Sequence, residues 1–117
     1  MSQAARRNEV ADERESDELI SRHVEPHPSK AGAAEWRLKE RGVPVWAVIG
    51  ALVLTANPAE HPEVLDARAV APLLGEQKAI EQVAQDYGVS RAAVEAAIAY
   101  YWRHKLLIDA RLTVNAG

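Results

Sequence analysis

The stretch "AIEQVAQDYGVSRAAVEAAI", residues 79–98, decides the fold that this sequence predicts. Before its glycine, apolar side chains recur at the spacing of one helix face, at Ile80, Val83, Ala84 and Tyr87. They recur in the same way after it, at Val94, Ala97, Ile98 and Tyr101. Gly88 can adopt the left-handed backbone that ends a helix, Val89 can fill the corner, and Ser90 can cap the next helix. This order is typical of a helix-turn-helix, whose second helix enters the major groove of DNA.

The second helix of this motif carries few groups that can bind DNA. The side chains expected to face away from the core are Arg91, Ala92, Glu95, Ala96 and Ala99. Among them only Arg91 can make a bidentate contact with guanine, while Glu95 would repel phosphate unless it meets a cytosine amine. Basic residues gather after the corner, and the predicted DNA-binding set is Ser90, Arg91, Glu95, Arg103 and Lys105. A helix-turn-helix that serves only as a packing scaffold is the alternative.

Upstream of the motif, the segment "EWRLKERGVPVW" (residues 35–46) begins with alternating apolar and charged residues. We predict a strand or extended arm here, with Trp36 and Leu38 on one side. A short helix closed by Gly42 is the alternative. The bases on the other side are candidate contacts for phosphate or for an acidic partner, or else form a solvated strand face: Arg37, Lys39 and Arg41.

The next segment, "PVWAVIGALVLTA" (residues 44–56), is apolar almost all round. Pro44 suits the first turn of a helix, which must be buried either by the fold or by a second subunit. Near the C-terminus, Tyr100, Tyr101 and Trp102 follow one another and cannot all point inward from one helix, which we expect to bend near His104. The predicted dimer or partner surface consists of Val45, Trp46, Ile49, Tyr100 and Trp102.

The composition of the 117 residues narrows the class of protein. No cysteine is present, which excludes disulfides, thiolate metal sites and thiol nucleophiles. The formal net charge of −3 argues mildly against a general nucleic-acid binder. The N-terminal residues are too polar for a secretory signal, and the longest apolar run, residues 43–56, is shorter than the ~20 residues of a membrane span. We therefore expect a soluble, cytoplasmic protein.

The sequence contains no recognisable catalytic or metal-binding pattern. His23 and His27 are four residues apart, but Pro26 and Pro28 interrupt the helix that this spacing would need. No third ligand completes a metal site. Ser90 lies in no arrangement with a histidine and a carboxylate, and there is no glycine-rich phosphate loop. We expect a protein that is not an enzyme and that uses no metal or cofactor.

Two longer segments, "RGVPVWAVIGAL" (residues 41–52) and "EQVAQDYGVSRAAVEAAIAYYWRHKLLIDARL" (residues 81–112), carry a set of motifs. The set begins with a Gly-Val-Pro-Val-Trp segment (residues 42–46) and an Asp-Tyr helix end (residues 86–87). It continues with an alanine-rich helix that ends in Tyr-Tyr (residues 96–101) and a tail that contains His104 and the pair Ile108-Asp109. With these motifs the chain resembles domain-of-unknown-function family 433 over about residues 20–115. The upstream "EPHPSKAGAAEWRL" (residues 25–38) is similar to the arm of an actinobacterial branch of that family.

The resemblance implies a mainly α fold, a homeodomain-like helix-turn-helix bundle with a short N-terminal β or extended arm. It also implies an antitoxin of the VapB type, encoded beside a PIN-domain-like ribonuclease toxin, that binds the toxin with one segment and its own promoter with another. The chain departs from the family pattern at about residues 57–76, an acidic helical insertion that could cover a partner site or create one. We expect residues 1–22 to form a flexible or partly helical arm and residues 23–117 to form the helix-turn-helix domain.

The expected function is that of an antitoxin-like, DNA-binding transcriptional autoregulator that pairs with a PIN-domain-like toxin and binds double-stranded DNA as a homodimer. Two-fold symmetry would double the small positive charge of each recognition helix and place two such helices one DNA turn apart. The alternative is a protein–protein interaction or dimerisation module that uses the helix-turn-helix as a scaffold and does not bind DNA.

Overall fold

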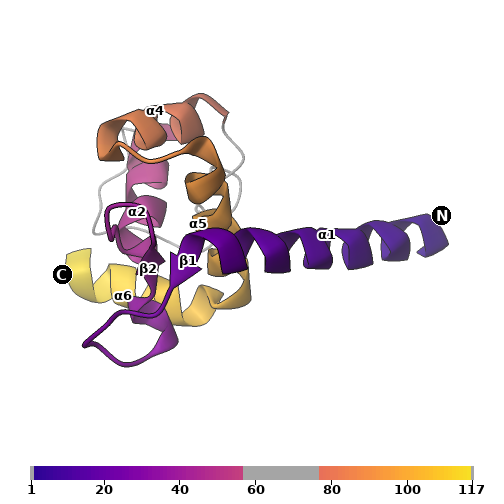
Figure 1. Ribbon diagram of the computed structural model, residues 1–117, viewed down its shortest axis with the longest axis horizontal. Helices are drawn as coiled ribbons and strands as arrows, with labels where there is room; N and C mark the ends of the chain where they lie inside the picture. The colour runs from indigo at the N-terminus through magenta and orange to yellow at the C-terminus, as the bar shows by residue number, and fades with distance from the viewer. Residues whose placement is uncertain (1, 57–76, 117) are drawn as a thin grey trace.

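Helices make up most of this protein. The computed structural model describes residues 2–56 and 77–116. Its elements in chain order are α1 (Ser2–His23), β1 (Val24–Glu25), η1 (Ala33–Glu35), β2 (Arg37–Leu38), α2 (Val45–Ala56), α4 (Gln77–Tyr87), α5 (Arg91–Arg103) and α6 (Lys105–Ala116). This order confirms the predicted mainly α bundle with a short strand arm (Figure 1). The expected insertion at residues 57–76 lies outside the described residues.

The predicted extended arm is a two-stranded antiparallel sheet. β1 pairs with β2 so that Val24 lies opposite Leu38 and Glu25 lies opposite Arg37. Val24 and Leu38 are buried in the core, whereas Arg37 faces outward. The alternation in the sequence therefore predicts the sides of this strand correctly, because successive side chains of a strand point to opposite faces.

α2 supplies the centre of the core, in which five of its side chains are buried: Val45, Val48, Ile49, Leu52 and Val53. α4 and α5 pack against α2, and α6 adds the buried side chains of Ile108 and Leu112. The chain's own fold therefore covers most of the apolar helix, for which the sequence allowed either the fold or a second subunit. Among the described residues, no helix is both long and apolar enough to cross a membrane.

The corner between α4 and α5 has the geometry that its sequence predicts. Gly88 adopts a left-handed backbone with a φ of 66°, and the N–H of Val89 donates to the carbonyl of Ala84 at 3.0 Å. The side chain of Val89 is buried. The hydroxyl oxygen of Ser90 accepts the N–H of Ala93 at 3.1 Å and so caps α5. Gly88, Val89 and Ser90 therefore have the roles that the sequence predicts for them, namely a left-handed turn, a buried side chain and a helix cap.

Replacing Gly88 with alanine is expected to destabilise the protein by about 1–2 kcal/mol, because a side chain strains the left-handed backbone at this position. A Cβ atom here would also lie 2.9 Å from Nε of Arg41, which would have to shift. The Gly88→Asn variant should lose less, because asparagine tolerates this conformation better than alanine does. Urea unfolding of both variants tests the assignment, and an alanine variant as stable as the wild type would contradict it.

The bend between α5 and α6 lies at His104, as predicted. His104 has non-helical dihedral angles, φ −128° and ψ 34°, and its N–H donates to the carbonyls of Tyr100 and Tyr101. Around this bend the three consecutive aromatic side chains point in different directions. Tyr100 and Tyr101 are buried, and Trp102 is exposed.

α1 lies across α5 and continues beyond the body of the molecule, as Figure 1 shows. Among the described elements, the contact of α1 with α5 is the most extensive. Leu19 and Ile20 anchor α1, since both are partly buried and pack against the core. The sequence predicts a flexible or partly helical arm at residues 1–22, and the structure has a helix from Ser2 to His23.

Candidate nucleic-acid interface

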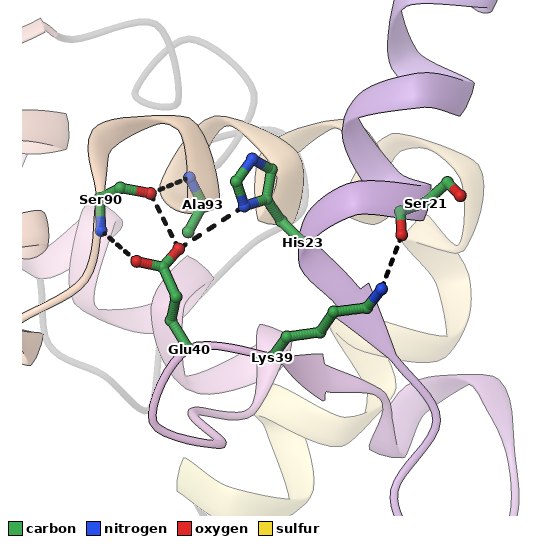
Figure 2. Close-up of polar contacts among 6 residues, drawn as sticks. All are labelled: Ser21, His23, Lys39, Glu40, Ser90 and Ala93. Carbon is green, nitrogen blue, oxygen red and sulfur yellow. Dashed lines mark hydrogen bonds and ion pairs between the residues drawn. The ribbon is translucent and has the colours of Figure 1, made fainter.

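The first turn of α5 is the part of the helix-turn-helix that would approach a DNA groove, and a carboxylate from the arm lies against it (Figure 2). Glu40, in the turn between β2 and α2, accepts the backbone N–H of Ser90 at 3.0 Å. Its other oxygen accepts the hydroxyl of Ser90 at 2.8 Å. Ser90 is thus the cap that the sequence predicts, but the two donors that it could offer to phosphate are used within the chain.

Two further contacts tie the arm to the end of α1, beside the start of α5 (Figure 2). Nδ1 of His23 lies 3.5 Å from the Glu40 carboxylate. Nζ of Lys39 donates to the carbonyl of Ser21 at 2.9 Å. Glu40 therefore connects three segments that are far apart in the sequence, namely the C-terminal end of α1, the arm and the N-terminus of α5.

These contacts lower the pKa of the Glu40 carboxyl. Desolvation alone would raise this pKa, but hydrogen bonds from the hydroxyl and the N–H of Ser90, together with His23, outweigh it and bring the pKa below its ordinary value. The helix N-terminus also favours a negative charge at this position. The carboxylate thus occupies the place at the start of α5 where an anionic ligand would otherwise be attracted.

The Glu40→Gln variant is expected to lose about 1 kcal/mol of stability at pH 7, since it weakens charge-assisted hydrogen bonds at a side chain that is 38% exposed. A carboxyl whose pKa is lowered by folding contributes stability above its unfolded pKa, and this contribution is lost as the pH falls. The stability difference between the variant and the wild type should therefore shrink from about pH 5 to about pH 3. Urea unfolding at both pH values measures it. A loss of equal size in the control Glu18→Gln, an exposed position of α1, would contradict the assignment.

Arg91, the predicted base-contacting residue, begins α5 and remains partly exposed. Its Nη1 donates to Glu81 of α4 at 2.9 Å, and its Nε donates to Glu95 one turn along α5 at 3.1 Å. All three side chains are at least 42% exposed. Because exposed ion pairs contribute little free energy, a DNA phosphate or a guanine edge can compete with these two carboxylates for Arg91. The structure thus groups Ser90, Arg91 and Glu95 at the N-terminal end of α5.

The other predicted contacts lie at or beyond the opposite end of this helix: Arg103 is the last residue of α5, and Lys105 is the first residue of α6. Arg103 forms an ion pair with Asp17 of α1 and also donates to the carbonyl of Glu13 at 3.0 Å. Lys105 donates to Asp109 at 2.7 Å within α6. The structure therefore does not bring these two cations to the first turn of α5, and the predicted DNA-binding set is divided between the two ends of this helix.

The three bases of the arm also bind groups of the chain itself. Arg37 donates to Glu25 across the two-stranded sheet at 2.9 Å, and Lys39 binds α1 as described above. Arg41 reaches the corner, where its Nε donates to the carbonyl of Gly88 at 3.0 Å. Of the three predicted arm contacts, Arg41 is thus the one placed beside the helix-turn-helix corner.

The exposed face of α5 is smaller than the sequence predicts. Ala96 was expected to face away from the core, but its side chain is completely buried. It shares one helical stripe with Ala92, Ala99 and Arg103, and Arg103 is bound to α1. α1 packs across α5 and binds Arg103 of this stripe, which reduces the exposed face of the helix. The expectation for Ala96 is therefore wrong.

The predicted dimer or partner surface is wrong at three of its five positions. Val45, Ile49 and Tyr100 are at most 3% exposed, so other elements of the same chain already cover them. The ring of Tyr100 stacks on Trp36 with the ring centroids 5.5 Å apart.

The two other residues of the predicted surface, Trp46 and Trp102, differ in their exposure to solvent. Trp46 is partly buried, and the guanidinium of Arg111 lies 4.4 Å from the centroid of its ring. Trp102 is 47% exposed, and it is accompanied on the surface by Leu106 and Leu107. A hollow of about 280 Å³ is lined by residues 102–107. The exposed apolar surface of the C-terminal region is therefore made by Trp102 with the start of α6.

Glu40 is a residue of this interface that cannot be identified from the sequence alone. It lies 50 positions before Ser90, and no short motif or periodicity connects the two. Within the residues that the structure describes, no group of three histidine or carboxylate side chains could hold a metal ion. Comparison of the chain with protein-family models, curated proteins and solved structures finds no match.

Proposed function

We propose that this protein is a DNA-binding, antitoxin-like transcriptional autoregulator that acts on its own promoter as a homodimer. The observation that carries the proposal is the corner formed by residues 88–90, with the first turn of α5 accessible at Arg91. A left-handed glycine, a buried apolar plug and a capping serine are the features of the turn that joins the two helices of a helix-turn-helix. The pairing with a PIN-domain-like ribonuclease toxin rests on the family resemblance alone.

In this proposal Arg91 makes the base or phosphate contact of each subunit. It exchanges its exposed ion pairs with Glu81 and Glu95 for a guanine edge or a phosphate. One arginine gives a weak contact, so the homodimer supplies the second recognition helix and doubles the number of phosphate contacts. Arg41 lies beside the corner and is the candidate for an additional phosphate contact.

A fluorescence-anisotropy titration with the protein's own upstream DNA and with a scrambled duplex tests this proposal. We expect the upstream duplex to bind more tightly and both affinities to fall as salt rises. Arg91→Ala should weaken binding to the upstream duplex about tenfold. The matched control is Lys30→Ala, which removes one positive charge from an exposed loop. Equal losses in the two variants would contradict the role of Arg91 as a specific contact.

The second candidate function, an interaction module without a DNA role, is favoured by a different observation. The candidate cations described above all bind carboxylates or carbonyls of the chain itself, while Trp102, Leu106 and Leu107 are exposed together. Exposed apolar groups of this kind are typical of protein-binding surfaces. Equal and weak binding of the two duplexes in the titration would favour this second function.

A further inference from the structure

We propose that α1 competes with DNA for the outward face of α5, so that DNA binding requires its displacement. The inference rests on the proposed DNA-binding function and adds its regulation. α1 lies across α5 and binds Arg103, one of the residues predicted to contact DNA. A duplex and the C-terminal half of α1 cannot both occupy the same side of α5.

The contacts of α1 define the surface that it covers. At one end of α5, the Arg103 side chain is bound by Asp17 and by the carbonyl of Glu13. At the other end, His23 contacts Glu40, which itself holds the cap of α5. Between these two ends lies the fully buried Ala96. The contacts of α1 thus reach from Arg103 to Glu40, which holds the cap of α5, and they leave Arg91 accessible.

The negative charge of α1, like its position, disfavours the binding of DNA to α5. Residues 13–18 have the sequence "ERESDE", with four carboxylates and one base, and the five charged side chains are all exposed. A duplex that extends along α5 as far as Arg103 would place its phosphates near these carboxylates, and like charges repel each other. For Arg103, the carboxylate of Asp17 takes the place that a DNA phosphate would take.

Part of the attachment of α1 consists of exposed polar contacts. The Asp17 side chain is 63% exposed and its partner Arg103 is 38% exposed, and exposed ion pairs of this kind add little stability. The apolar anchors Leu19 and Ile20 are only partly buried. The N-terminal half of α1 extends away from the body of the molecule (Figure 1). Displacement of α1 therefore breaks an ion pair between exposed groups and the packing of two partly buried anchors.

The test uses two full-length variants that change the charge of α1 equally. Asp17→Arg breaks the contact with Arg103, whereas Glu15→Arg makes the same charge change at an exposed position next to it. We expect Asp17→Arg to bind the upstream duplex about fivefold more tightly than Glu15→Arg does. We also expect faster hydrogen exchange in residues 13–23 of Asp17→Arg. A third variant, Ile20→Ser, releases α1 without a charge change and should bind about threefold more tightly than the wild type.

The possible results separate this inference from the proposed function. If α1 exchanges faster in Asp17→Arg and Ile20→Ser but their affinities equal those of their controls, competition is overturned while DNA binding stands. If α1 exchange is unchanged in both variants, the assigned attachment is overturned. If the wild type and all variants bind both duplexes equally weakly, the proposed function itself fails. Circular dichroism of each variant confirms that it is folded.

Discussion

Ile49→Ala is expected to lower the free energy of unfolding by about 2–5 kcal/mol, the cost of removing a large side chain from a close-packed core. The Ile49 side chain is completely buried in the middle of α2, which α4, α5 and α6 contact. Urea unfolding, followed by circular dichroism, measures the loss. Such a loss is a large fraction of the stability of a typical small domain.

The same variant separates a core role of α2 from a role in a subunit interface. If Ile49 belongs to the core of each chain, its loss of stability is the same at low and high protein concentration. The control is Leu54→Ala on the same helix, whose side chain is 37% exposed and which should lose less than about 1 kcal/mol. An Ile49→Ala variant that keeps its unfolding free energy but changes its oligomeric state would contradict the burial of this side chain.

Strongly alkaline solution is expected to unfold this protein through its two buried tyrosines. Burial raises the pKa of Tyr100 to about 12, and its hydroxyl donates to the carbonyl of Ala33 at 2.6 Å. Burial also raises the pKa of Tyr101, and the carboxylate of Asp109, which accepts its hydroxyl at 2.6 Å, raises it further. Both hydroxyls therefore stay protonated in the folded protein at pH values where an unfolded chain ionises them.

The loss of stability at alkaline pH follows from the difference between the folded and the unfolded pKa of each tyrosine. A tyrosine whose folded pKa is raised contributes stability that is complete below its unfolded pKa of about 10 and is lost as the pH rises toward the folded pKa. Each group contributes about 1.4 kcal/mol per pH unit, so the two together remove about 5 kcal/mol by pH 12. Denaturant unfolding from pH 8 to pH 12 measures this loss.

A double variant, Tyr100→Phe with Tyr101→Phe, identifies the groups responsible for the alkaline loss. It is expected to be less stable than the wild type at pH 8, because it lacks two hydrogen bonds, but to lose much less stability as the pH rises. Tyr87→Phe, at a partly exposed ring, is the control and should leave the pH profile unchanged. Parallel profiles for the double variant and the wild type would show that other groups cause the alkaline loss.

The parts of the fold that the sequence predicts correctly depend on neighbouring residues. The corner of Gly88, Val89 and Ser90 is one example, because a left-handed glycine and a capping serine act within a few positions. The bend at His104 and the sides of the β2 strand are others. In each case the residue type determines the backbone conformation at its own position or the side to which its side chain points. This effect is local and does not depend on tertiary contacts.

The parts that the sequence does not predict depend on distant partners. Glu40 reaches Ser90 across 50 positions, and an isolated carboxylate in a turn carries no sign of such a contact. The run of residues 100–102 shows that one aromatic side chain must be exposed, but not that it is Trp102. The apolar α2 is compatible with burial by its own chain or by another. Likewise, the polar segment that forms α1 gives no sign that it packs along α5.

Hydrogen exchange of the wild-type protein, measured with and without its upstream duplex, tests most directly whether DNA binds α5 in place of α1. We expect slower exchange in residues 91–103, where DNA covers the recognition helix, and faster exchange in residues 13–23, where α1 is displaced. The opposite sign for α1, or no change in either segment at saturating DNA, would contradict the proposal that DNA and α1 compete for the same face of this helix.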